Sequence, residues 1–342
     1  MQILNLPVWP YVYGSPTCTG VIRQQAEDFV VDEQLAFTPS GSGEHVFLQI
    51  EKTGENTEYI ARQLARFAGV RQRDIGYAGL KDRHAVTTQW FSIWLPGAAD
   101  KDPDWQLLSS EQIKILQAIR HARKLKRGVL AGNRFKIIVR DWQGDREATL
   151  HQLEQMKSNG IANYYGEQRF GHNGQNVSRA LSLFQGGKVN REQRSLYLSA
   201  ARSFLFNQIL AHRVLENNWN QPLAGDVFVF DASHSCFKST QPDAEIIRRV
   251  AAKEIHPTGV LWGRGDVDVA GDALAIEQAV INAYPELAQG LVSAGAERNR
   301  RGLRINVPDL QWSFISDTVL QLSFSLPAGS YATSLIREII KM

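Results

Sequence analysis

A single carboxylate in the segment "GLKDRHA" (79–85) is the first candidate for chemistry in this sequence. Asp82 lies between Lys81 and Arg83, after one strand-like run and before another, so we expect a loop held between rigid elements. The two flanking cations favour the ionised carboxylate. An ionised aspartate in a fixed position could act as a nucleophile or as a general base. A solvated turn is the competing interpretation of the three residues.

Two basic clusters are candidates for phosphate binding. The segment "RHARKLKRG" (120–128) has Arg, Lys or His at six of its nine positions, and "ERNRRGLR" (297–304) contains four arginines. Cations at this density bind phosphates and release counterions, although they could equally form a solvated face. Between the clusters, "GNRF" (132–135) and "NYYGEQRFGHNG" (163–174) combine aromatic, amide and arginine groups. Such mixtures bind unstacked RNA bases, but many isolated aromatic residues belong to the core.

Composition limits the class of protein without identifying it. The chain has 342 residues, 43% of them hydrophobic, and a formal net charge of +3, which is too small to indicate a nucleic-acid partner by itself. The two cysteines, Cys18 and Cys236, are far apart and show no metal-ligand spacing, so we expect neither a disulfide framework nor a metal site. No stretch approaches the roughly 18 apolar residues of a membrane span, and the N-terminus lacks a leader pattern. We expect a globular cytoplasmic protein.

The elements that must position these residues change in character along the chain. From residue 20 to about 140 the apolar runs are short and typical of strands, and they fall at 28–34, 45–52, 86–95 and 134–140. One helix is expected between Asn56, a good N-cap, and Gly69. Helical periodicity dominates from about 146 to 295.

Strand signals return near the C-terminus, at 303–307, 310–315 and 319–326. Ser330 is expected to cap a short terminal helix. This order favours an α+β domain with a mixed sheet built from both chain ends, in which the late strands complete the early sheet, and a mainly helical domain inserted between them. Two tandem domains are the alternative, but three late strands make a small sheet to be stable alone.

Six segments occur together in the order seen in the TruD family of tRNA pseudouridine synthases, and the chain resembles that family over nearly its whole length. The segments are "RQQAEDFVVDE" (23–33), "GLKDRHAVTTQ" (79–89), "GNRF" (132–135), "NYYGEQRFG" (163–171), "RSFLFN" (202–207) and "PAGSYATSLIRE" (327–338).

The resemblance implies an architecture and a reaction. It implies a discontinuous catalytic pseudouridine synthase domain over 1–157 and 304–342, interrupted by a family-specific insertion domain over 158–303. The family isomerises a uridine in RNA, typically at position 13 of tRNA, by breaking the N-glycosidic bond, turning the uracil and rejoining it through C5. The family's catalytic aspartate falls on Asp82, as the nucleophile, and no cofactor or metal is implied. Whether Asp82 attacks the sugar or the base stays open.

The resemblance also implies residues that contact the target nucleotide. These are Phe29, Asn133 and the aromatic residue of "AGSYATS". That residue is Tyr331 here, where phenylalanine is familiar, so the stacking face is kept and a hydroxyl is added. Phe135 lines the pocket or belongs to the core.

Three basic residues complete the predicted site. Arg23 occupies a place where a basic residue is usual in the family, and Lys81 and Arg169 are expected to meet phosphates or to orient Asp82. The expected partner is tRNA, with no membrane and no obligate protein partner, so we expect a monomer.

Two other classes of function are compatible with parts of the sequence. An RNA-binding protein or tRNA chaperone without catalysis would not need Asp82. A glycoside hydrolase would need a second acid, Glu33 or Glu167, within roughly 5 to 10 Å of Asp82. The basic clusters suit a polyanion better than a neutral glycan.

Overall fold

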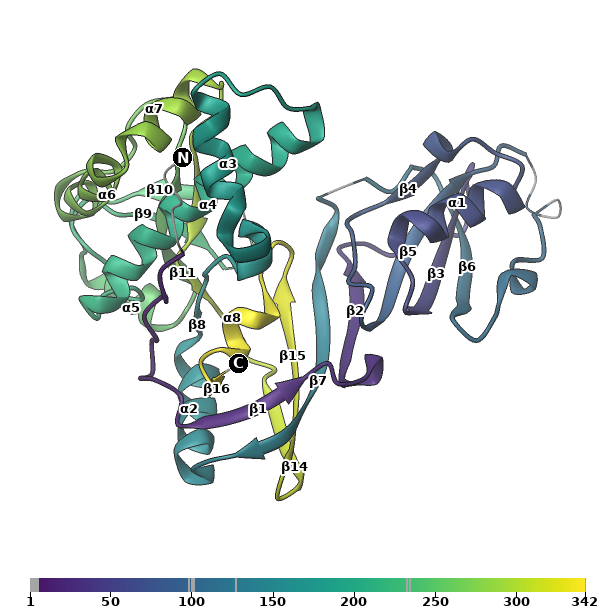
Figure 1. Cartoon of the computed structure of the whole chain (residues 1–342), viewed down its shortest axis with the longest axis horizontal. Coiled ribbons are helices and arrows are strands. Elements are labelled where there is room, and N and C mark those ends of the chain that lie inside the picture. The colour runs from purple at the N-terminus through teal and green to yellow at the C-terminus, as the bar shows by residue number, and fades with distance from the viewer. Residues whose placement is uncertain are drawn as a thin grey trace. The chain divides into compact units, whose positions relative to one another are not determined.

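The computed structural model describes residues 6–97, 99, 102–126, 128–231, 233 and 235–341, and the chain divides into two compact units, each assembled from separate segments (Figure 1). The sheet unit comprises Thr17–Arg146, Asp309–Gly329 and Ile340–Met342, and the helical unit comprises Met1–Pro16, Glu147–Pro308 and Ser330–Ile339. The units differ from the domains expected above, because residues 1–16, 147–157, 304–308 and 330–339 belong to the helical unit. Those domains stay a prediction.

The sheet unit is built on a ten-stranded mixed sheet with the order β14-β15-β7-β2-β5-β3-β6, to which β1, β4 and β16 add at the sides. Two strand pairs, β2 with β5 and β1 with β16, are parallel, and the other pairs are antiparallel. The strands are β1 (Cys18–Ile22), β2 (Phe29–Leu35), β3 (His45–Thr53), β4 (Ile75–Tyr77), β5 (Val86–Trp94), β6 (Ile113–His121), β7 (Leu130–Gln143), β14 (Gln311–Ser316), β15 (Val319–Pro327) and β16 (Ile340–Lys341).

Late strands complete the early sheet, as expected. Strand β15 pairs with β7 from Leu320 opposite Val139 to Pro327 opposite Gly132, and β14 then pairs with β15 as the edge strand. Figure 1 shows β15 beside β7. The predicted α+β class with a mixed sheet from both chain ends is therefore confirmed.

The predicted helix of the sheet unit is also confirmed. Helix α1 (Thr57–Phe67) has Asn56 at its N-cap position, although the Asn56 side chain makes no capping hydrogen bond, and the chain turns out of the helix at Gly69 with φ of +66°. Its buried face includes Ile60 and Leu64, which share a core with apolar residues of β3, β5 and β6. Burial of this stripe fixes the helix on one face of the sheet.

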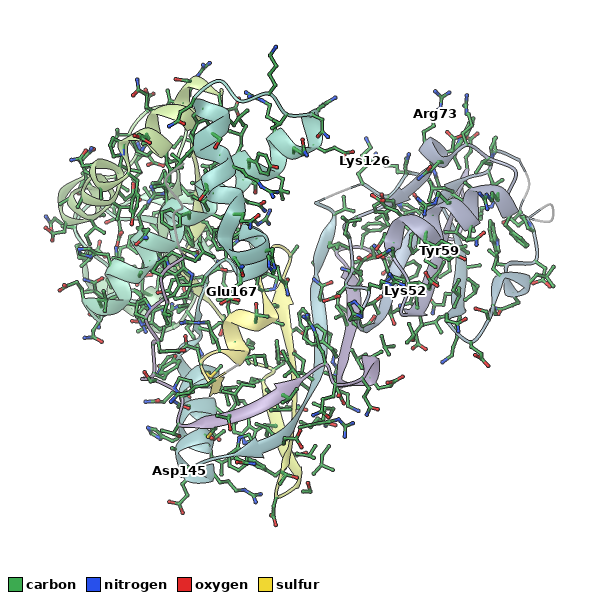
Figure 2. The ribbon with its side chains drawn as sticks, in the orientation of Figure 1. Lys52, Tyr59, Arg73, Lys126, Asp145 and Glu167 are labelled. Atoms are coloured by element: carbon green, nitrogen blue, oxygen red, sulfur yellow. The ribbon has the colours of Figure 1, made fainter. Side chains whose placement is uncertain are left out.

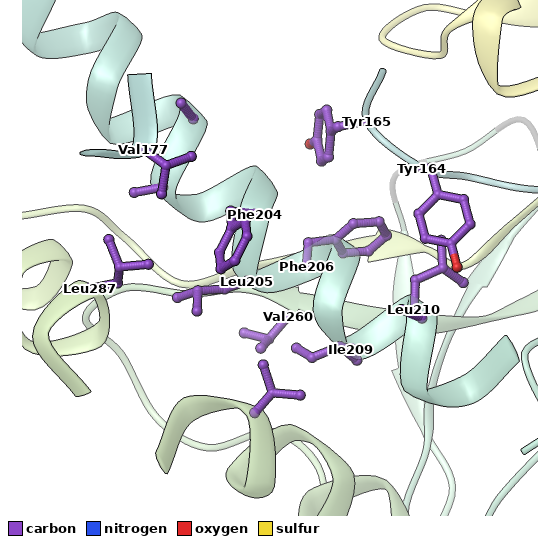
Figure 3. Close-up of a cluster of buried hydrophobic side chains, with 14 of the residues drawn as sticks. Tyr164, Tyr165, Val177, Phe204, Leu205, Phe206, Ile209, Leu210, Val260 and Leu287 are labelled. Atoms are coloured by element: carbon purple, nitrogen blue, oxygen red, sulfur yellow. The ribbon is translucent and has the colours of Figure 1, made fainter. Parts of the chain in front are cut away.

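Helices dominate the helical unit, and the long helix α4 forms the centre of its core. Figure 3 shows Phe204, Leu205 and Ile209 of α4 in a buried cluster with Val260 and Leu287. The helices are α2 (Arg146–Asn159), α3 (Gln175–Phe184), α4 (Arg191–Leu215), α5 (Ala244–Ala251), α6 (Gly271–Ala283), α7 (Pro285–Ser293) and α8 (Ala332–Ile336). No helix among the described residues is both long and apolar enough to cross a membrane.

The helical unit also contains strands that helical periodicity did not reveal. A four-stranded sheet has the order β10-β9-β11-β12, and β13 pairs separately with β8. The strands are β8 (Ile161–Ala162), β9 (Val227–Phe230), β10 (Cys236–Lys238), β11 (Ile255–Leu261), β12 (Asn299–Gly302) and β13 (Arg304–Ile305).

Two expectations for late segments were wrong. The segment 303–307 does not join the large sheet: only Arg304–Ile305 is a strand, and Leu303 packs in the core of the helical unit. The terminal helix begins at Ala332 with Tyr331, not Ser330, at its N-cap, and no side chain caps it. The strand in the first segment pairs with β8, about 140 residues earlier in the sequence, and local patterns do not report such a pairing.

Candidate active site

Side-chain hydrogen bonds anchor the loop 78–85, which joins β4 to β5. The backbone N–H of Lys81 donates to Thr57 Oγ1 at 3.0 Å, and the Thr57 hydroxyl donates to Gln89 Oε1 at 2.9 Å. Gln89 Nε2 in turn donates to the carbonyl of Gly79 at 2.6 Å. The predicted loop between rigid elements is therefore tied to both α1 and β5.

Both oxygens of the Asp82 carboxylate are engaged within this loop region. Oδ2 forms an ion pair with Arg23 Nη2 at 2.9 Å, and Oδ1 accepts the backbone N–H of His84 at 3.1 Å. The Asp82 side chain is still 31% exposed, so a reactant can approach it. Arg23 has a φ of +62°, a conformation that is uncommon outside glycine and that clusters at functional sites.

A series of aromatic rings in contact begins at Phe29, beside this ion pair. The Arg23 guanidinium lies 4.1 Å from the centroid of the Phe29 ring. Phe29 contacts Phe135 edge to face, with centroids 6.2 Å apart, and Phe135 stacks on Phe324 at 5.4 Å. Phe29 and Phe135 are 4% and 7% exposed, so both rings contribute to the core. Their contact with a nucleotide stays a prediction.

Lys81, whose side chain is 9% exposed, bonds to two side chains of the neighbouring strands β2 and β7. Its ammonium forms an ion pair with Glu33 Oε2 at 2.8 Å and donates to Asn133 Oδ1 at 2.6 Å. Glu33 Oε1 accepts the backbone N–H of Trp90. Burial raises the pKa of Glu33, and the charge of Lys81 opposes that rise. Sequence reasoning named Glu33 only as a glycosidase acid, although its alternation with Phe29 in β2 placed it on the inward face.

Arg169 and Tyr331 lie in the helical unit and are bonded to each other. Arg169 Nε donates to the Tyr331 hydroxyl at 2.8 Å, and Nη1 donates to Ser199 Oγ at 2.9 Å. Burial raises the pKa of Tyr331, and Arg169 opposes the rise. Asn207 of "RSFLFN" fixes the backbone at Tyr165, because its side chain accepts the Tyr165 N–H and donates to the Tyr165 carbonyl. The hydroxyl that tyrosine adds is therefore satisfied by Arg169.

The first basic cluster is divided between structural and exposed residues. Arg120 is buried in β6 and forms an ion pair with Asp102. Lys124 donates to the carbonyl of Arg73, whereas Arg123 and Lys126 are exposed (Figure 2 labels Arg73 and Lys126). Exposed cations of this segment can still meet phosphate.

Arg300, Arg301 and Arg304 bond to partners within the helical unit, whereas Arg298 lies over the ring of Trp262, so a phosphate site at 297–304 stays a prediction. Arg300 forms an ion pair with Glu277 at 2.7 Å, and Arg304 donates to His256 Nδ1 at 2.9 Å. Arg301 donates to Asn163. The partners come from other elements of the helical unit, which is why composition alone did not reveal them.

The two candidates for the second acid of a glycosidase lie in different surroundings. Glu33 has a fully buried side chain that is paired with Lys81, and Glu167 is an exposed residue of the helical unit (Figure 2). Within the described part of the chain, no group of three or more His, Cys, Asp or Glu residues is placed to hold a metal ion.

Lys52 is a further buried group that sequence reasoning missed. It follows Val46, Leu48 and Ile50 on the buried face of β3, so the alternation of buried residues was the signal that could have revealed its burial. Its ammonium donates to the carbonyls of Glu55 at 2.6 Å and Asp82 at 3.4 Å (Figure 2). Burial lowers the pKa of Lys52 to about 8, while the charges of Asp82 and Glu55 raise it and that of Lys81 lowers it.

This pKa predicts a pH dependence of stability. An unfolded lysine has a pKa of about 10.4, so the folded state binds the Lys52 proton more weakly. The resulting penalty is present below about pH 8 and is relieved as pH rises to about 10.4. The free energy of unfolding of the wild type should therefore rise across this window relative to Lys52→Met. Urea unfolding at several pH values would measure it.

Lys114→Met is the matched control for this experiment. Lys114 is an exposed lysine of β6 that pairs with Glu51, and this pair raises its pKa. The variant should keep the rise in stability between about pH 8 and about 10. Parallel curves for the wild type and Lys52→Met would contradict the assignment.

Comparison with known proteins supports one family. The family model of tRNA pseudouridine synthase D (TruD) matches residues 6–181 and 173–339. A tRNA pseudouridine synthase D of Methylococcus capsulatus is 52% identical over 334 residues, which cover 97% of this chain and 94% of the relative. Another from Nitrosococcus oceani is 48% identical over 336 residues, with 96% and 93% covered.

A solved structure supports the fold. The crystal structure described as tRNA pseudouridine synthase D from Methanosarcina mazei matches with a TM-score of 0.75 at 21% identity, over 97% of this chain and 96% of that one. The fold and the family model together define the class as pseudouridine synthases, which are isomerases. The chain belongs to the tRNA pseudouridine synthase D (TruD) family, as the sequence motifs predicted.

Proposed function

We propose that this chain converts uridine to pseudouridine at position 13 of tRNA, with Asp82 as the nucleophile. The observation that carries the proposal is the Asp82 carboxylate: it is partly exposed, lies on an anchored loop and is paired with Arg23. The names of the relatives support tRNA as the substrate.

The reaction balances without a co-reactant. The bond between N1 of uracil and C1′ of ribose breaks, the base turns, and a bond between C5 and C1′ forms. The proton on C5 is lost and N1 gains one, so substrate and product are isomers. Asp82 forms a transient bond to the nucleotide and leaves when the new bond is complete.

The target uridine must leave its stack to reach Asp82, at a cost of about a few kcal/mol. We propose that Phe29, Asn133 and Tyr331 contact it and offset part of this cost. Phe29 is placed beside the Arg23 and Asp82 pair, which supports its role. The predicted contacts of Phe135, Lys81 and Arg169 with the substrate rest on the resemblance.

Pseudouridine mapping tests the proposal. Unmodified tRNA with uridine at position 13 would be incubated with the wild-type protein, labelled with carbodiimide and read by primer extension. We expect a stop at position 13, and no stop there in a transcript with cytidine at that position. A stop elsewhere would move the target, and no stop despite tight binding would favour a chaperone.

Replacement of Arg23 should slow the reaction. Arg23→Met removes the ion pair with Asp82 and the cation on Phe29, so the carboxylate loses its fixed partner. Loss of one preorganised electrostatic contact typically lowers kcat by about 10²-fold. Single-turnover rates on tRNA would measure the change.

Arg83→Met is the matched control. Arg83 is next to Asp82 in sequence, but its guanidinium donates to the carbonyl of Gly54 at 2.9 Å and the residue is exposed. We expect a rate near that of the wild type. Equal losses in both variants would mean that the loop, and not the ion pair, is what Arg23 supports.

A further inference from the structure

In the sheet unit, the Lys81 side chain bonds to the side chains of Glu33 and Asn133. This contact fixes which hydrogen-bonding group Asn133 can present to a ligand. Glu33 of β2 and Asn133 of β7 are directly opposite each other in the antiparallel ladder. The Lys81 ammonium reaches both, at 2.8 Å from Glu33 Oε2 and 2.6 Å from Asn133 Oδ1. Because the Glu33 carboxylate is buried and accepts the backbone N–H of Trp90, it holds the ammonium in place.

The orientation of the Asn133 amide follows from the chemistry of lysine. An ammonium has three donors and no acceptor, so only the amide oxygen can face it. The Asn133 side chain therefore directs its Nδ2 amide group away from Lys81. Asn133 is half-buried, and no described residue forms a hydrogen bond with Nδ2. The side chain offers hydrogen-bond donors to a ligand, while its amide oxygen faces the ammonium and already accepts one hydrogen bond from it.

We propose that Glu33 and Lys81 are positioning residues that hold Asn133 as a donor, and that Asn133 thereby selects uridine over cytidine through the oxygen on C4 of the target base. This inference rests on the proposed function. At position 2 both bases carry the same carbonyl oxygen. At position 4 uracil has an acceptor where cytosine has an amino donor. A side chain that presents its donor group to the base can therefore favour uridine through that group only at position 4.

Paired binding measurements test the inference. All proteins would be the full chain with Asp82→Asn, so that no turnover occurs, and the ligands would be two tRNA transcripts that differ only in uridine or cytidine at position 13. One hydrogen-bonded base contact gives about tenfold discrimination, so the parent should bind the uridine transcript about tenfold more tightly. Adding Asn133→Asp offers an acceptor in place of the donor, and the preference should vanish or reverse.

The positioning role is tested by a second change. Lys81→Met alone leaves an unpaired buried charge on Glu33, which destabilises the fold, so the neutral pair Glu33→Gln with Lys81→Met is used. Freed from the ammonium, the Asn133 amide can turn, and the preference for uridine should fall toward equal binding. If the pair had only a structural role, the double variant would bind both transcripts more weakly by the same factor, and the ratio of the two affinities would not change.

Three results would overturn the inference: a parent that binds both transcripts equally, an Asn133→Asp variant that keeps the tenfold ratio, or a folded double variant that keeps it. Circular dichroism and thermal melting would establish folding. Failure of the proposed function has a different signature, because the wild type would then give no stop at position 13 in the mapping experiment.

Discussion

Asp82→Asn is expected to abolish pseudouridine formation, with a loss of at least about 10⁴-fold in kcat. The amide has nearly the shape of the carboxylate but is not a nucleophile. Its oxygen can still accept the N–H of His84, the bond that the carboxylate makes at 3.1 Å. The loop is also held by bonds that do not involve the side chain of Asp82, such as the one from the Lys81 N–H to Thr57. The variant should therefore fold normally.

Pseudouridine mapping and tRNA binding, measured on the same proteins, show whether this variant has lost catalysis or binding. The wild type should give a stop at position 13 and Asp82→Asn should give none, while both bind tRNA. A stop with both proteins would keep the enzyme and move the chemistry to another residue. Asp32→Asn is a useful comparison, because Asp32 is a nearby acidic residue of β2 whose carboxylate bonds Gln34 rather than Arg23.

Arg213→Met should destabilise the helical unit by about 3 to 5 kcal/mol, the usual cost of breaking a buried ion pair from one side. Arg213, 2% exposed, lies at the end of α4 and forms an ion pair with the fully buried Asp226 at 3.0 Å. It also donates to the carbonyls of Asn218 and Gln221. Burial raises the pKa of Asp226, and Arg213 opposes this rise.

Denaturant unfolding would measure this effect. Combining Arg213→Met with Asp226→Leu removes both charges, so much of the lost stability should return. Arg248→Met is the control, since Arg248 pairs with Glu245 and Glu254 at the surface of the same unit and should matter little. A double variant as unstable as Arg213→Met would show that the carbonyl contacts, rather than the unpaired Asp226, set the cost.

Much of the candidate site was predictable because its key features are local. The flanked aspartate on a loop between strands needed only residue types and spacing, and α1 followed from its cap and apolar stripe. The inward positions of Glu33 and Lys52 were also present in the period-2 alternation of β2 and β3. A polar residue at a position where the alternation of a strand predicts burial therefore indicates a group that bonds within the site.

Composition alone misled where a cation's partner is distant in sequence. The arginines of 297–304 were interpreted either as a phosphate site or as a solvated face, but Arg300 is paired with Glu277 of α6 and Arg304 with His256 of β11. A high density of basic residues in a sequence segment gives the charge of the segment, but it does not show whether these side chains are exposed to solvent. Only the packing of the helical unit decided which of these charges are available.

The sequence by itself determined the α+β class, the family and the candidate carboxylate Asp82, because these depend on local periodicity and ordered motifs. It also favoured the completion of the early sheet by late strands, because three strands make a small sheet to be stable alone. Tertiary structure decided the partners: Arg23 for Asp82, Glu33 and Asn133 for Lys81, and Arg169 for Tyr331. Such pairs join residues from separate elements, and local preferences carry no information about which buried donor meets which acceptor. The need to satisfy buried polar groups then selects the pairing within the fold.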